Sequence, residues 1–168
     1  MIVRRMMCIL LLAVSTTACG DDSAARDCQQ PGRDPKRQAA ACTQVIAADP
    51  KSAKAYNNRC FAYNEQAQYE KSLADCNMSI KLDPRDASAY NNRGVAYEMR
   101  GELEPALKDY SKAIALYPEF AVAFANRGDV YSKKGDKERA IAEYRRALVL
   151  EPGNGIALNG LKQLGVRP

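Results

Sequence analysis

Three stretches of the chain share one pattern: residues 53–63 read AKAYNNRCFAY, residues 87–97 read ASAYNNRGVAY and residues 121–131 read AVAFANRGDVY. Each is followed by a second block, which ends in KLDP, ALYP or VLEP. The resulting copies, residues 53–86, 87–120 and 121–154, are each 34 residues long without insertion or deletion. A constant period of this kind predicts a repeat array in which each copy is one supersecondary unit.

Each copy contains two segments with helical spacing. In the first, an aromatic residue is followed seven residues later by a tyrosine, which places both on one helical face. These aromatic columns are Tyr56, Tyr90 and Phe124, and Tyr63, Tyr97 and Tyr131. The second segment carries columns of small residues, which let two helices approach closely. Those small columns are Ser72, Ala106 and Ala140, and Ser79, Ala113 and Ala147. We therefore expect two packed helices in each copy.

Turn signals separate the segments. Gly101 and Gly135 stand between the two predicted helices, where a left-handed cap residue is favoured, and Ala67 takes this place in the first copy. Proline follows every second segment and ends the helix there. These prolines are Pro84, Pro118 and Pro152. Each copy is therefore predicted to be a helix-turn-helix hairpin.

This pattern resembles the tetratricopeptide repeat (TPR) family over residues 53–154, with Arg59, Arg93 and Arg127 where the family usually has leucine. The resemblance implies an all-α, right-handed α-solenoid whose concave groove binds a partner segment. Residues 34–52 match the second helix of a repeat, and residues 155–168 restart a first helix. We therefore predict one TPR domain over residues 34–168, with an N-terminal half repeat, three full repeats and a C-terminal cap helix.

The N-terminus has a short basic start, an apolar run over residues 6–14 and small residues before Cys19. This pattern predicts a secretory signal peptide over residues 1–18, too short for a membrane span. Ser15–Cys19 (STTAC) resembles a bacterial lipobox, which implies cleavage and acylation of Cys19. The alternative is ordinary cleavage after Ala18 without a lipid. The polar residues 19–33 are predicted to be the lipidated cysteine and a tether.

The cysteine count supports this interpretation. Of six cysteines, Cys8 leaves with the signal peptide and Cys19 is acylated, so an even number remains. Cys60 and Cys76 share alignment columns with Gly94 and Tyr110, and these columns face each other in an antiparallel hairpin. Replacement of both partners together is what a cross-link requires. We therefore predict the disulfides Cys60–Cys76 and Cys28–Cys42; the alternative is buried free thiols.

Composition argues against several functional classes. The chain has no histidine, the commonest general base and a common metal ligand, and no phosphate-binding loop, nucleophile elbow or CxxC pair. Without Arg4 and Arg5 of the signal peptide, 23 basic residues face 20 acidic ones, a net charge of +3 that is interspersed along the chain. Nothing here indicates nucleic-acid binding. We predict no enzyme activity, no cofactor, no metal and no small-molecule substrate.

Asparagines recur at the repeat period and are the best candidates for partner contacts. A carboxamide donates and accepts, so it can pair with a peptide backbone without reading its side chains. The family resemblance implies an asparagine ladder along the groove, which would span roughly 20 Å and hold about six extended residues. The predicted contact residues are Asn57, Asn58, Asn91, Asn92 and Asn126, the apolar residues Phe61, Val95, Met99 and Val122, and the lysines Lys54 and Lys133. The three ladder residues, Asn58, Asn92 and Asn126, are expected to face solvent; the alternative is an ordinary solvated helix face.

Arginine also recurs at the repeat period, with an acid in each second helix. The pairs would be Arg59 with Asp75, Arg93 with Asp109 and Arg127 with Glu143. A basic groove is one interpretation of these arginines. The matched acids favour the other, an ion pair within each hairpin.

Two functions are consistent with these features. The first is a protein-protein interaction scaffold that binds an extended partner segment, lipid-anchored at the bacterial cell envelope and facing the periplasm. The second is an accessory or chaperone-like lipoprotein for assembly of an envelope machine, such as a pilus, secretion system or cell-wall enzyme complex. The choice between inner and outer membrane stays open, and neighbouring genes would separate the two functions.

Overall fold

The structure is a computed structural model that describes residues 18–30 and 34–167. The predicted signal peptide therefore lies outside the described residues except for Ala18, and so does the side chain of Cys19. The described part contains nine α-helices and no strand. The helices are α1 (Ala18–Gln29), α2 (Pro35–Ala48), α3 (Ala53–Glu65), α4 (Tyr69–Leu82), α5 (Ala87–Met99), α6 (Leu103–Leu116), α7 (Ala121–Lys133), α8 (Lys137–Leu150) and α9 (Gly155–Gln163).

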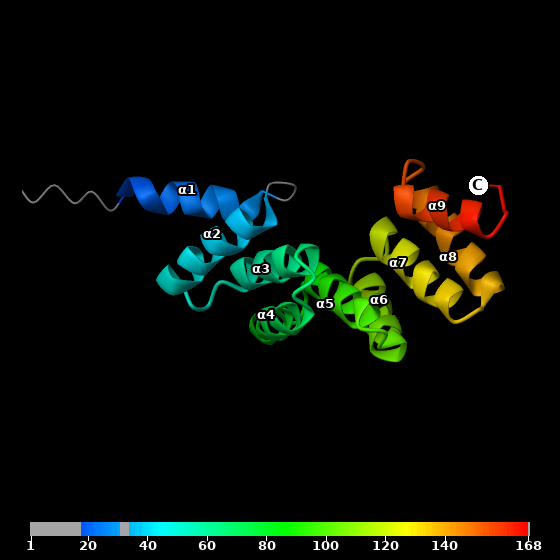
Figure 1. Cartoon of the computed structure of the whole chain (residues 1–168), viewed down its shortest axis with the longest axis horizontal. Helices are drawn as coiled ribbons and strands as arrows, with labels where there is room; N and C mark the ends of the chain where they lie inside the picture. Colours follow the sequence, from blue (N-terminus) through cyan, green and yellow to red (C-terminus); the bar gives the residue numbers. More distant parts are fainter. Residues whose placement is uncertain (1–17, 31–33, 168) are drawn as a thin grey trace, which may run out of the picture.

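The helices form a curved stack of hairpins. Each odd-numbered helix contacts the next odd-numbered helix, whereas no two even-numbered helices of the described chain pack together. The odd-numbered helices therefore form a continuous inner layer, and the even-numbered ones spread apart outside it. Figure 1 shows the resulting arch, with α1 and α9 at its two ends and α4 and α6 at its base. The predicted all-α array of helical hairpins is confirmed.

The turns follow the predicted signals. Gly101 and Gly135 have φ of 78° and 80°, and Ala67 adopts the same left-handed region with φ of 54°. This conformation is unfavourable for a residue with a Cβ atom, so the first turn is the strained one. Helices α4, α6 and α8 end at Leu82, Leu116 and Leu150, each two residues before its proline.

The glycine and tyrosine columns of the repeat alignment face each other within each hairpin, as predicted. A Cβ atom built on Gly94 would lie 2.7 Å from the ring of Tyr110, and one on Gly128 would lie 2.7 Å from the ring of Tyr144. Glycine is therefore required at both positions for the close approach of ring and helix. In the first repeat the same place holds the disulfide Cys60–Cys76, with Cα atoms 5.4 Å apart.

The N-terminal segment differs from the prediction. The expected tether contains helix α1, which packs against both α2 and α3. Ala24 and Cys28 are buried, the disulfide Cys28–Cys42 joins α1 to α2, and Arg37 pairs with Asp27 at 2.8 Å. The half repeat predicted over residues 34–52 is thus the second helix of an additional hairpin. The prediction failed because α1 buries small side chains and a disulfide instead of large apolar residues.

The cap helix α9 is also shorter than the predicted segment 155–168, since it ends at Gln163 and is followed by Gly165 with φ of 73°. Leu161 and Ala157 of α9 are fully buried against α7 and α8. This packing closes the C-terminal end of the stack.

Candidate functional site: the inner face of the repeat array

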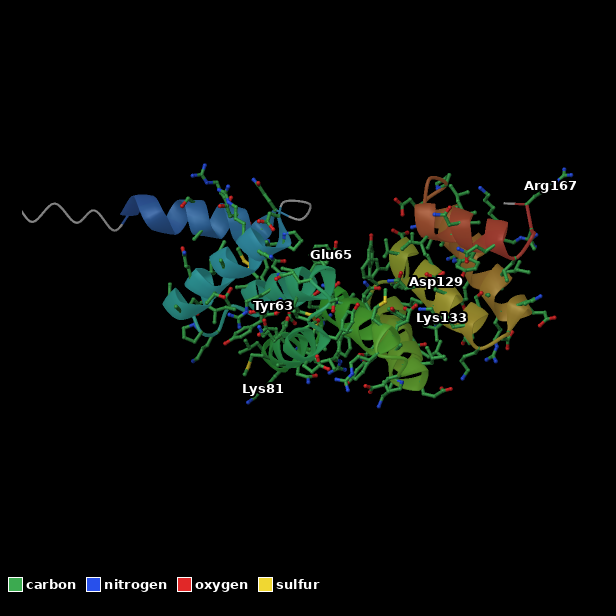
Figure 2. The ribbon with its side chains drawn as sticks, in the orientation of Figure 1. Tyr63, Glu65, Lys81, Asp129, Lys133 and Arg167 are labelled. Carbon is green, nitrogen blue, oxygen red and sulfur yellow. A yellow bond between two sulfur atoms is a disulfide. The ribbon has the colours of Figure 1, made fainter. Side chains whose placement is uncertain are left out.

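The inner face, formed by α3, α5, α7 and α9, is where the sequence predicted partner contacts. Figure 2 labels Glu65 at α3, and Asp129 and Lys133 along α7. In the repeat alignment Met99 is equivalent to Lys133, and its side chain is 56% exposed. Lys54 is exposed, and Phe61, Val95 and Val122 are half-buried.

The asparagines of this face bind one another across the repeats. Asn92 donates to Oδ1 of Asn57 at 2.8 Å, and Asn126 donates to Oδ1 of Asn91 at 3.0 Å. Asn57 donates in turn to Asp86 at 3.1 Å. Asn57, Asn91 and Asn126 are buried, so the expectation that all three ladder residues face solvent is wrong for Asn126. These carboxamides connect adjacent repeats, and their mutual bonds use donors and acceptors that a partner would need.

Asn58 and Asn92 are half-buried. Asn58 lies near the N-terminal disulfide, with its Nδ2 atom 4.0 Å from Sγ of Cys28. The backbone carbonyl of Asn92 accepts a hydrogen bond from Asn64 at 2.8 Å. Contact of either side chain with a partner stays a prediction.

A pocket of about 320 Å³ opens on the inner face between α7 and α9. Its lining residues are Asp129, Ser132, Lys133, Tyr144, Ile156, Asn159, Gly160 and Gln163. Sequence reasoning named only Lys133 among them. Asp129 was missed because its column varies, with Phe61 and Val95 in the earlier copies. Its departure from the repeat pattern on an inner-face column was the available signal. Asn159 instead continues the column of Asn57 and Asn91, so the repeat period could have identified it.

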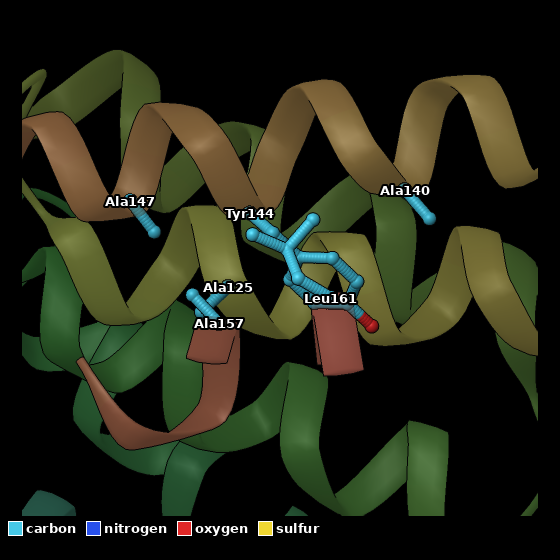
Figure 3. Packing of buried hydrophobic residues seen from close by; sticks show 6 residues of the cluster. All are labelled: Ala125, Ala140, Tyr144, Ala147, Ala157 and Leu161. Atoms are coloured by element: carbon cyan, nitrogen blue, oxygen red, sulfur yellow. The ribbon is translucent and has the colours of Figure 1, made fainter. Parts of the chain in front are cut away.

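The tyrosine under this pocket holds a carboxylate in place. Figure 3 shows Tyr144 beside Leu161, among the small side chains of the C-terminal cluster. Its hydroxyl donates to Oδ1 of Asp129 at 2.6 Å. One repeat earlier, the hydroxyl of Tyr110 donates to Glu98 at 2.6 Å, and Nζ of Lys133 lies 2.7 Å from the same carboxylate. The face therefore carries two carboxylates and one ammonium group within a small region.

Burial shifts the protonation equilibria of these groups. Desolvation raises the pKa of Asp129 above its usual range, and the nearby charge of Glu98 adds to this effect. The hydrogen bond from Tyr144 lowers the pKa of Asp129, and so does the positive charge of Lys133. Burial also raises the pKa of Tyr144 and of Tyr110, so both phenols stay protonated and act as donors.

The arginine column lies away from the inner face and forms the predicted ion pairs. Arginine–carboxylate distances are 2.6 Å for Arg59–Asp75, 2.7 Å for Arg93–Asp109 and 2.8 Å for Arg127–Glu143. Each arginine also bonds to the second helix of the preceding hairpin, and these acceptors are Thr43, Asn77 and Ser111. The arginines therefore hold hairpins together and to their neighbours.

The described residues contain neither a candidate membrane span nor a candidate metal-binding cluster. No helix in residues 18–30 and 34–167 is long and apolar enough to cross a membrane. The same part of the chain has no group of three or more His, Cys, Asp or Glu side chains that could hold a metal ion.

Stacked helical hairpins with an open inner face define a helical repeat protein of the α-solenoid class. Tetratricopeptide repeat models match residues 53–86, 87–120 and 121–154, and the chain belongs to this family. No curated protein sequence matches it.

Solved structures share the fold. The crystal structure of MamA has a TM-score of 0.67 and 24% sequence identity, with 88% of this chain and 85% of that chain covered. The first TPR of Spaghetti (RPAP3), bound to HSP90 peptide SRMEEVD, has a TM-score of 0.64 and 26% identity over 70% of this chain and 93% of that one. The second TPR domain of human RPAP3, in complex with HSP70 peptide SGPTIEEVD, has a TM-score of 0.61 and 28% identity. The match covers 67% of this chain and 93% of that one.

Proposed function

We propose that this protein is a non-enzymatic interaction domain that binds an extended segment of a partner protein on its inner face. The observation that carries the proposal is the open pocket between α7 and α9, at the end of the continuous inner layer of odd-numbered helices. Two similar TPR domains are described as bound to peptides, which supports peptide binding by this domain. The exposed side chain of Met99 offers an apolar contact on the same face.

The protein is further proposed to act at the bacterial cell envelope, anchored by a lipid on Cys19 and facing the periplasm. The signal-like residues 1–18 and the lipobox-like Ser15–Cys19 support this location. The two disulfides also support it, because disulfides persist mainly in oxidising compartments. Periplasmic exposure would give both bonds a suitable environment.

Substitution of one inner-face residue tests the binding function. Met99→Glu places a charge on the proposed surface, and Val149→Glu, at a side chain 72% exposed on α8, is the matched control outside it. Partners captured by cross-linking in the envelope should be recovered with wild type and Val149→Glu, and be strongly depleted with Met99→Glu. Equal recovery with Met99→Glu, in a protein of unchanged melting temperature, would rule out this face as the binding surface.

Lipidation is tested at Cys19. Wild type should incorporate labelled palmitate and sediment with membranes, whereas Cys19→Ala should do neither. Cys8→Ala, which changes a cysteine within the predicted signal peptide, is the control and should behave as wild type. Equal labelling of wild type and Cys19→Ala would reject the anchor and leave the binding proposal standing.

A further inference from the structure

The pocket between α7 and α9 has a charge that its own residues do not balance. Among the described residues that line it, Lys133 is the only cation, and its ammonium group is paired with Glu98 at 2.7 Å. Asp129 receives a hydrogen bond from Tyr144 on Oδ1, and no cationic side chain forms a salt bridge with it in the described chain. Two carboxylates of this region therefore share one ammonium group, in a place partly withdrawn from water.

The rest of the pocket offers acceptors and an apolar wall. Asn159 and Gln163 project from successive turns of α9, and in the described chain their carboxamides make no hydrogen bond to another residue. Each supplies a free carbonyl acceptor. Ile156, 36% exposed, supplies an apolar surface beside them. A long cationic side chain, with methylenes ending in several N–H donors, is complementary to this combination.

We propose that this pocket accepts a lysine or arginine side chain of the partner segment, with its charged end at Asp129 and its methylenes along Ile156. The inference rests on the proposed function, because the side chain is presented by a segment bound on the inner face. It also separates this chain from the RPAP3 domains, whose peptides SRMEEVD and SGPTIEEVD end in acidic sequences. A carboxylate-rich ligand would meet Asp129 and Glu98 with like charge.

A random peptide library tests the preference without assuming a partner. Peptides of about seven residues, enough to follow the inner face, are displayed on phage and selected on the purified full chain. Lysine or arginine should be enriched at one position. Synthetic peptides with that residue should bind about tenfold more tightly than versions with norleucine, which keeps the methylenes and removes the charge.

Two substitutions should move this preference in opposite directions. Asp129→Asn removes the charge, keeps an acceptor for Tyr144 and should abolish the advantage over norleucine. Lys133→Gln removes the competing ammonium group and should increase affinity for the basic peptide by roughly threefold. Asp83→Asn is the matched control, since Asp83 is exposed at the end of α4, where its side chain accepts only from the backbone of Arg85.

The outcomes separate the inference from the proposed function. Enriched peptides without a basic residue that lose binding in Met99→Glu would overturn the inference and leave inner-face binding intact. An unchanged preference in Asp129→Asn would also overturn it. Failure to enrich any peptide would contradict both proposals. Spermidine that competes at the affinity of the peptide would indicate a site for small cations, which contradicts docking by a partner segment.

Discussion

At the scale of single residues, Asp129 shows how this fold accommodates a group that does not stabilise it. The carboxylate is partly withdrawn from water and lies near Glu98, and both effects raise its pKa. The hydrogen bond from Tyr144 offsets only part of this, and Lys133 is engaged with Glu98. A charged aspartate is thus less stable here than in the unfolded chain, as is common at functional sites.

The pH dependence of stability tests this conclusion. A raised pKa in the folded state means that the native protein binds more protons than the unfolded one between the two pKa values, so stability falls as the pH rises through that window. Asp129→Asn does not titrate. At a pH well below the ordinary aspartate pKa, its stability should equal that of wild type. As the pH rises through the raised pKa, the variant should become more stable than wild type.

Melting temperatures of both proteins across acid and neutral pH measure the difference. Asp83→Asn is the control and should track wild type throughout. An Asp129→Asn protein that is less stable than wild type at neutral pH would show that the carboxylate stabilises the empty fold.

At the scale of elements, the α3–α4 hairpin replaces the ring-on-glycine contact with a covalent bond. Where the α5–α6 hairpin has Gly94 against Tyr110, the α3–α4 hairpin has Cys60–Cys76. The α3–α4 hairpin therefore also lacks the hydroxyl group that Tyr110 supplies. Asn64 stands in the column of Glu98, which accepts from Tyr110, and its buried Oδ1 atom has no hydrogen-bond partner among the described residues. The α3–α4 hairpin thus keeps an acceptor, Oδ1 of Asn64, but lacks the tyrosine hydroxyl that would donate to it.

Restoring the repeat pattern should compensate for loss of the disulfide. Cys60→Ala with Cys76→Ala should lower the free energy of unfolding by about 3 kcal/mol, because a closed loop of this length no longer constrains the unfolded chain. Cys60→Gly with Cys76→Tyr lacks the same bond but regains a buried ring and a donor for Asn64. It should recover about 1–3 kcal/mol of that loss.

Urea unfolding of the two double variants compares them directly, since both retain Cys28–Cys42. If the glycine–tyrosine variant is no more stable than the alanine variant, then the α3–α4 hairpin cannot form the tyrosine-on-glycine packing of the later hairpins. Cys76→Tyr alone should be the least stable protein, because the ring would meet the Cys60 side chain.

At the scale of the whole molecule, each helix of the described chain packs only on helices of its own or an adjacent hairpin. Among the described helices, α9 contacts α7 and α8, and α1 contacts α2 and α3. Stability in such an array is close to a sum of nearest-neighbour terms, so a local change has local effects. The N-terminal hairpins carry both disulfides, whereas the C-terminal end depends on apolar packing around Tyr144 and Leu161.

A cavity at the C-terminal end should therefore stay local. Leu161→Ala removes a fully buried side chain and should cost about 2–5 kcal/mol. Hydrogen exchange measured by mass spectrometry should show lost protection in α8 and α9, with α3 and α4 unchanged. Val149→Ala, on the exposed side of α8, is the control. Equal loss of protection in every helix would show that the array unfolds as one cooperative unit.

Contacts within a hairpin were predictable from the sequence. The alignment of copies placed Gly94 opposite Tyr110, Cys60 opposite Cys76 and Arg93 opposite Asp109, and the structure brings each pair together. These contacts join two short helices linked by a tight turn. Helical periodicity and turn residues are local properties, so they determine which faces of such a hairpin meet.

Contacts between hairpins were decided by the tertiary structure. Asn92 reaches Asn57 and Asn126 reaches Asn91 across 35 residues, and the pocket combines residues of α7, α8 and α9. The repeat period predicted that asparagines would recur but not whether they face solvent or each other. That depends on the rotation between successive hairpins, which is set by the packing of all their side chains together. For the same reason α1, which has little apolar surface of its own, is a helix in the structure because α2, α3 and a disulfide hold it there.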